Sequence, residues 1–169
     1  MLNKTLSSRR LLLITLGLTY IATGMLGALP GASLIRLASN THVSLETVSS
    51  MFTIWGAGGL LGTVLTGILI RYSKPKYLLM LGLFSLGSGS ILASLTSSFL
   101  LLLIGQTLVG VAFGCIDISL NTIATLAFQD TLSEELNTIH AMFGLEHCLV
   151  LWFLLLVYNF STACHWPTL

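Results

Sequence analysis

The sequence predicts an all-α, multi-pass transmembrane helix bundle of about five helices. Hydrophobic residues make up 54% of the 169 residues and charged residues only 8%, against the roughly 25% charged content of ordinary soluble domains. The charges are also clustered, so that residues 11–35, 47–70 and 77–116 carry none. Because a helix needs ~20 apolar residues to cross the hydrocarbon core, each of the first two runs accommodates one span and the third accommodates two.

The third run gains its second span from an apolar continuation past Asp117, and a fifth span starts near His140. The first run is ~20 residues long, whereas the core of a secretory signal has 7 to 15, and further spans follow it. We therefore interpret it as a membrane span rather than a cleaved leader. The predicted helices lie near residues 11–34, 50–70, 77–95, 99–126 and 140–160.

Basic residues predict the orientation in the membrane. Arg36 alone lies between the first two spans, whereas six basic residues fall in the N-terminal tail and in the loop RYSKPK: Lys4, Arg9, Arg10, Arg71, Lys74 and Lys76. Loops rich in Lys and Arg stay on the cytoplasmic side. We expect residues 1–10 to form a cytoplasmic tail of a cell-membrane protein, in the inner or plasma membrane.

The same composition limits the partners and the chemistry. A net charge of +1 without a basic stripe predicts no nucleic-acid partner. The loops leave no room for a soluble domain, so the function is expected between the helices, with the lipid bilayer as partner, and no enzyme, cofactor or metal site is predicted. Cys115, Cys148 and Cys164 lie in or beside spans and are interpreted as apolar filler.

Small residues recur at helical spacing in the predicted spans, and small residues let helices approach closely in lipid. The first two spans carry the sets Tyr20, Gly24, Gly27, Gly31 and Trp55, Gly59, Gly62, Thr66. We expect most of these glycines to serve helix packing.

The fourth span carries the strongest signal for function. Its small and polar residues recur at steps of three or four, which aligns them on one helical face: Gln106, Gly110, Gly114, Asp117, Asn121 and Thr125. A carboxylate inside the bilayer costs about 2.5–3.5 kcal/mol and normally faces a bundle interior or a wet cavity. Asp117 lies ~27 Å along the helix from Phe99, in the cytoplasmic half. It is either a proton or cation site on a solute pathway, or an acid hydrogen-bonded to neighbours such as Asn121.

These residues resemble the N-terminal half of a major facilitator superfamily transporter, in the fucose permease-like and sodium-dependent glucose transporter-like branch. The resemblance rests on GALP in the first span, a glycine-rich second span, a short basic loop, GVAFGCIDISLN and IHAMFGL. It covers residues 11–145, which we take as a partial N-terminal domain of that fold.

The resemblance implies twelve helices in two halves, with the solute site between the halves. Asp117 then matches the helix-four acid linked to cation coupling, and Asn121 and His140 match polar positions that face the cavity. The function implied is alternating-access transport of a small polar solute, such as a sugar, coupled to protons or sodium. The chain alone would be incomplete, and would need a second copy or a C-terminal half. The alternative is a non-transporting remnant or a small membrane interaction subunit.

Two departures from the family pattern concern charge. The loop between helices two and three keeps Gly67 and its basic character, but Arg71 stands where the family has Asp. Fucose permease also has an acid in helix one, whereas residues 11–35 contain none.

The resemblance stops at Leu145, where the family continues Gly-Ala-Leu-Leu-Gly-Pro and this chain has Glu146 and His147. With suitable synonymous codons, the bases of residues 145–151 spell that family motif in the shifted frame. We hypothesise that residues 146–169 are a divergent, frameshifted tail; a DNA sequence without the required bases would refute this. The alternatives are metal ligation with His140 and Cys148, or a proton relay, since His140, Gly144 and His147 share a helical face.

Overall fold

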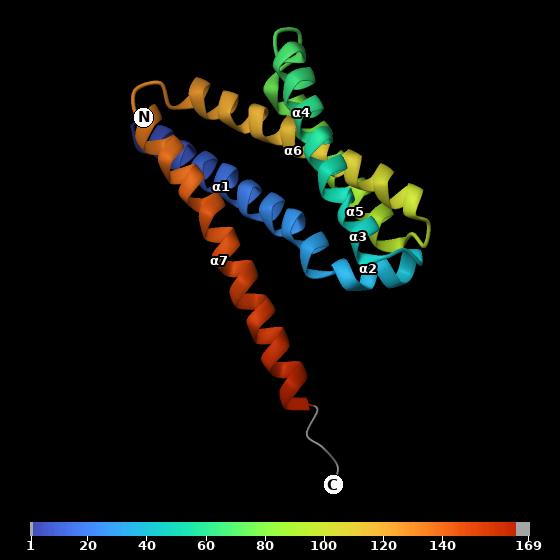
Figure 1. Cartoon of the computed structure of the whole chain (residues 1–169). Helices are drawn as coiled ribbons and strands as arrows, with labels where there is room; N and C mark the ends of the chain where they lie inside the picture. The colour runs from blue at the N-terminus through green and yellow to red at the C-terminus, as the bar shows by residue number, and fades with distance from the viewer. Residues whose placement is uncertain (1, 165–169) are drawn as a thin grey trace.

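The computed structural model describes the backbone of residues 2–164, and the side chains of residues 9–142 with some beyond them. These residues form helices and no strand (Figure 1). The helices are α1 (Leu2–Ala32), α2 (Leu34–Thr41), α3 (Leu45–Ser49), α4 (Met51–Leu69), α5 (Pro75–Leu95), α6 (Phe99–Ala127) and α7 (Leu132–Cys164).

Four helical segments in the described part of the chain are long and apolar enough to cross a membrane. They are Arg9–Ala32, Leu45–Leu69, Pro75–Leu95 and Phe99–Ala127. Large apolar side chains such as Leu60 and Phe84 point outward and are more than two-thirds exposed, as expected for a surface in contact with lipid. The predicted all-α, multi-pass bundle is confirmed. The fifth predicted span lies inside α7, where many side chains fall outside the described residues, and it stays a prediction.

Helix ends differ from the predicted bounds where local chemistry acts. The run predicted as 11–34 is interrupted at Ser33, three residues after Pro30, whose ring removes one backbone donor from α1. His42 ends α2 in the left-handed conformation, with φ 55°. At the start of α7, Glu134 and Glu135 occupy the first turn, where acidic side chains favour a helix, so α7 begins well before His140.

Helix α6 is the centre of the bundle, and α4 and α5 pack closely against it. On the α4 side, Gly62 faces the backbone of Val111, and Gly114 faces the backbone of Thr63. On the α5 side, a Cβ added at Gly89 would lie 2.8 Å from the carbonyl oxygen of Gly105. Glycine on both faces therefore allows these three helices to approach backbone to backbone.

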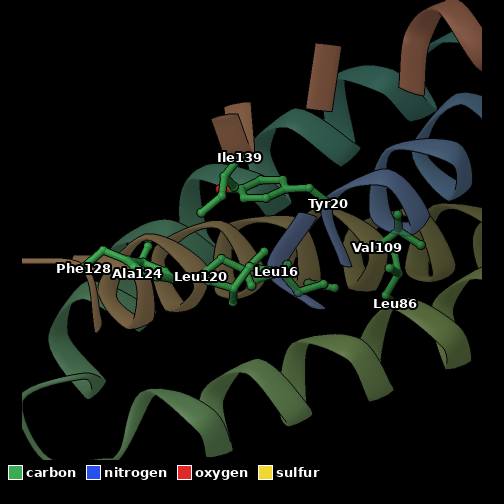
Figure 2. Close-up of a cluster of buried hydrophobic side chains, with 10 residues drawn as sticks. Leu16, Tyr20, Leu86, Val109, Leu120, Ala124, Phe128 and Ile139 are labelled. Carbon is green, nitrogen blue, oxygen red and sulfur yellow. The ribbon is translucent and has the colours of Figure 1, made fainter. Parts of the chain in front are cut away.

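Helices α1 and α7 form a separate pair that lies side by side (Figure 1). They meet α6 through a cluster of buried side chains drawn in Figure 2. Its members are Leu16, Tyr20, Leu86, Val109, Ala112, Ile116, Leu120, Ala124, Phe128 and Ile139. This cluster holds α1 and α7 against the three helices that pack through glycines, α4, α5 and α6. The candidate functional residues lie beside it.

An ion pair joins the start of α1 to the connection between α6 and α7. The guanidinium of Arg9 lies 3.8 Å from the carboxylate of Asp130, and the two side chains are 47% and 87% exposed. Figure 1 shows the N-terminus next to this connection. The two segments thus share one end of the bundle; that this end is cytoplasmic stays a prediction.

Candidate functional site

Asp117 lies half-buried in the middle of the bundle and accepts two hydrogen bonds. The phenol of Tyr20 on α1 donates to Oδ1 of Asp117 over 2.6 Å. The side-chain amide of Asn121, one turn further along α6, donates to the same oxygen over 3.2 Å. Hydrogen bonds to an ionised group are the stronger kind, so both donors fix this carboxylate in place.

The Tyr20 contact was absent from the sequence-based site. The sequence pattern includes Tyr20 only as the first member of a small-residue set on α1, although a phenol in a charge-free span indicates a buried polar partner. Its side chain is 5% exposed. On its other side, the ring of His140 on α7 lies 5.9 Å away, centroid to centroid, at 52°. Tyr20 thus joins α1, α6 and α7 at one point.

A cavity of about 270 Å³ opens at this point. Side chains that carry oxygen come from Tyr20, Thr23, Thr63 and Asp117, and His140 also lines the cavity. Phe113, Ile116 and the glycines Gly59 and Gly114 complete the wall. At ~30 Å³ per water molecule, the space holds several waters or a hydrated ion.

The hydroxyls of Thr23 and Thr63 are oriented by their own helices. Thr23 donates to the carbonyl oxygen of Thr19 over 2.7 Å, and Thr63 donates to that of Gly59 over 2.9 Å. A hydroxyl has one proton and two lone pairs. With the protons held by backbone, the oxygen atoms keep lone pairs for a ligand in the cavity.

Gln106 does not join this cavity, although it shares the helical face of Asp117. It lines a second cavity, about 240 Å³ in volume, between α1, α2, α5 and α6. Thr125, at the other end of the stripe, is exposed and bonds the carbonyl oxygen of Asn121 on its own helix. Of the predicted pathway residues, the structure therefore gathers Asp117, Asn121 and His140, and separates Gln106.

The predicted packing glycines occupy several environments. Gly59, Gly62, Gly110 and Gly114 lie between α4 and α6. The other two predicted positions are on α1, where Gly24 is buried and Gly27 faces the ring of Phe113.

The residues predicted for the cytoplasmic loop lie at the α4–α5 connection, away from Asp117. Gly67 has no atom of another element within 4 Å of a would-be Cβ. Arg71, Lys74 and Lys76 are exposed, and Lys76 lies 4.9 Å from the ring centre of its neighbour Tyr77.

The metal alternative concerns Glu146 and His147 together with His140 and Cys148. The side chains of Glu146 and His147 lie outside the described residues, and the described Cys148 is exposed. Among the described residues no three His, Cys, Asp or Glu side chains gather into a metal-binding group. Cys115 is buried and accepts a hydrogen bond from Thr66 over 2.9 Å.

The chain is similar to two curated transporters. It is 24% identical over 126 residues to sodium-dependent glucose transporter 1A of Mus musculus, and this alignment covers 75% of this chain and 30% of the relative. It is 26% identical over 118 residues to sodium-dependent glucose transporter 1 of Xenopus laevis, and this alignment covers 70% of this chain and 24% of the relative. No family model matches, and no solved structure matches significantly. The aligned part of this chain spans less than a third of either relative.

Replacing Tyr20 with phenylalanine should weaken the link between α1 and α6. The change keeps the ring that packs on His140 but removes the hydroxyl that holds Asp117. Hydrogen bonds to charged groups contribute about 1.5–3 kcal/mol, so the unfolding midpoint in detergent should fall. The control is Tyr77→Phe, an exposed tyrosine on α5; equal midpoints for the two variants would contradict the contact.

Proposed function

We propose that this chain forms part of a membrane transporter that moves a small polar solute, such as a sugar, with sodium bound at Asp117. The observation that carries the proposal is a half-buried carboxylate inside a span, at the wall of a cavity that α1, α4, α6 and α7 line together. Ionisable side chains at membrane depth are costly, and they commonly mark ion or solute pathways. The site thus has the features expected of a coupling-ion position.

The chemistry of the lining favours a hard cation. Hard cations take oxygen ligands, and the lining includes four residues whose side chains carry oxygen: Tyr20, Thr23, Thr63 and Asp117. Tyr20 and Asn121 donate hydrogen bonds to Asp117. Their polar hydrogens stabilise the negative charge of the carboxylate, as a bound cation also would. A sodium ion bound at this carboxylate would compete with Tyr20 for its negative charge, thereby coupling the occupancy of the site to the position of α1.

The names of the two relatives support sodium and a sugar as the pair that is moved. The relatives are three to four times longer than the part that aligns, so transport by this chain is proposed for an assembly. In major facilitator folds the solute site lies between two halves. A second copy of the chain or a separate C-terminal half would complete it.

The experiment is uptake of radiolabelled glucose into vesicles of the native membrane, compared with vesicles from cells that lack the gene. An imposed inward sodium gradient should drive uptake that depends on the chain, and a pH gradient should not. Uptake driven by the pH gradient alone would assign the site to protons. Equal uptake with and without the chain, for glucose and for other monosaccharides, would instead favour a non-transporting remnant or interaction subunit.

A further inference from the structure

Three exposed cations, which we name the basic cluster, lie at the connection between α4 and α5: Arg71, Lys74 and Lys76. None of the three forms an ion pair with a carboxylate among the side chains that the structure describes. Arg9, by contrast, is paired with Asp130. Residues 47–116 contain neither Asp nor Glu. The chain around the connection therefore supplies no counter-charge to the basic cluster.

The start of α5 adds to this positive charge. Pro75 lies at the beginning of the helix, and the first turn contains no acidic side chain. Lys74 is the N-cap residue, and its side chain makes no capping hydrogen bond. The unsatisfied N–H groups at the start of a helix carry about half a positive charge. An anion near the basic cluster thus meets three side-chain cations and a helix dipole of the same sign.

The neighbouring side chains place the basic cluster at the level of lipid headgroups. Both helices belong to segments long and apolar enough to span a membrane, and Leu69 near the end of α4 and Met80 in α5 are large, apolar and exposed. Between these two positions, Tyr72 and Tyr77 are 83% and 56% exposed. Tyrosine is enriched where the hydrocarbon layer meets water. The three cations therefore lie beside the phosphate groups of the surrounding lipid.

The charges of the basic cluster also discriminate between headgroups. Each Lys or Arg near a negatively charged membrane surface strengthens binding by about fivefold. Phosphatidylcholine carries a quaternary ammonium next to its phosphate, and the connection has no carboxylate that would pair with that ammonium. Phosphatidylglycerol has the same phosphodiester without the ammonium. The basic cluster thus favours a headgroup with net negative charge.

We propose that the basic cluster binds the headgroup of an anionic phospholipid. The connection is predicted to face the cytoplasm, and the cytoplasmic leaflet carries negative surface charge. The site is separate from the cavity at Asp117, whose lining includes no residue of the basic cluster. Because α4 and α5 both pack on α6, a lipid bound at their connection holds this end of the three helices at the membrane surface.

The test titrates the purified full chain, in detergent micelles, with phosphatidylglycerol that carries a dansyl group on one acyl chain. Energy transfer from tryptophan to dansyl reports binding, since Trp55 lies on α4. Unlabelled phosphatidylglycerol should displace the probe more than about tenfold better than phosphatidylcholine with the same acyl chains. Inorganic phosphate should displace it no better than chloride at equal ionic strength, because a free anion lacks the apolar chains that hold a headgroup at this level.

The decisive variant replaces all three cations of the basic cluster by glutamine, and it should bind the probe about 100-fold more weakly, whereas Lys74→Gln alone should lose about fivefold. The matched control is Arg36→Gln, which removes one exposed cation from α2 and should leave the affinity unchanged. All of the replaced side chains are exposed, so the unfolding midpoints without phosphatidylglycerol should equal that of the wild-type chain.

Three results would overturn the proposal. The first is equal displacement of the probe by the two phospholipids, and the second is displacement by inorganic phosphate, which would assign the cluster to a free anion. The third is an affinity that the triple variant retains, or that Arg36→Gln loses to the same degree as Lys74→Gln.

Discussion

Asp117→Asn should reduce sodium-driven uptake about 5- to 150-fold, the usual range for coupling between two sites. The asparagine keeps the size of the side chain and an oxygen that can accept from Tyr20 and Asn121, so the helices should stay in contact. It lacks the negative charge that a cation needs in a site with no other acid in its wall. Uptake into native membrane vesicles from cells with the altered gene measures the effect.

The matched control is Asp130→Asn, which makes the same chemical change at a carboxylate that is 87% exposed. An exposed ion pair contributes about 0–1 kcal/mol, so this variant should transport at close to the normal rate. If the Asp117→Asn variant took up solute at the wild-type rate, Asp117 would have no role in coupling.

Gly114→Ala should destabilise the bundle by about 1–3 kcal/mol, the cost of overpacking a close contact. A Cβ at Gly114 would lie 2.7 Å from the carbonyl carbon of Gly62, and it also meets the backbone of Thr63. Backbone atoms cannot rotate away as a side chain can, so α4 and α6 must separate. Unfolding in detergent, followed by circular dichroism, measures the loss.

Gly67→Ala is the control with the opposite expected sign. This glycine lies on the same helix, α4, and a Cβ there meets no atom within 4 Å. Alanine is better than glycine inside a helix by about 1 kcal/mol, so Gly67→Ala should raise the midpoint slightly. If both alanine variants behaved alike, close approach of α4 and α6 at Gly114 would be contradicted.

The sequence was sufficient for features that depend on one helix at a time. Long apolar runs predict the spans because the thickness of the hydrocarbon core sets their length. The pairing of Asp117 with Asn121 follows from a spacing of one turn, and the structure shows the hydrogen bond between them. The turn at Ser33 was missed because the run around it is uniformly uncharged, and the early start of α7 was missed because its first turns are polar.

Contacts between helices required the structure. Tyr20 and Asp117 are 97 residues apart, and helical spacing alone cannot say which residue of α1 meets which residue of α6. Gln106 shows that residues on one face of a helix can also lie in different sites. It shares a helical face with Asp117, but the two side chains line separate cavities whose walls have no residue in common.

Equilibrium binding of radioactive sodium to the purified chain tests most directly the claim that Asp117 holds a cation. The wild-type chain and Asp130→Asn should bind sodium saturably, with potassium as a weaker competitor, and Asp117→Asn should show no saturable binding. Saturable binding that is unchanged in Asp117→Asn, or its absence from the wild-type chain, would contradict a sodium site at the junction of α1, α6 and α7.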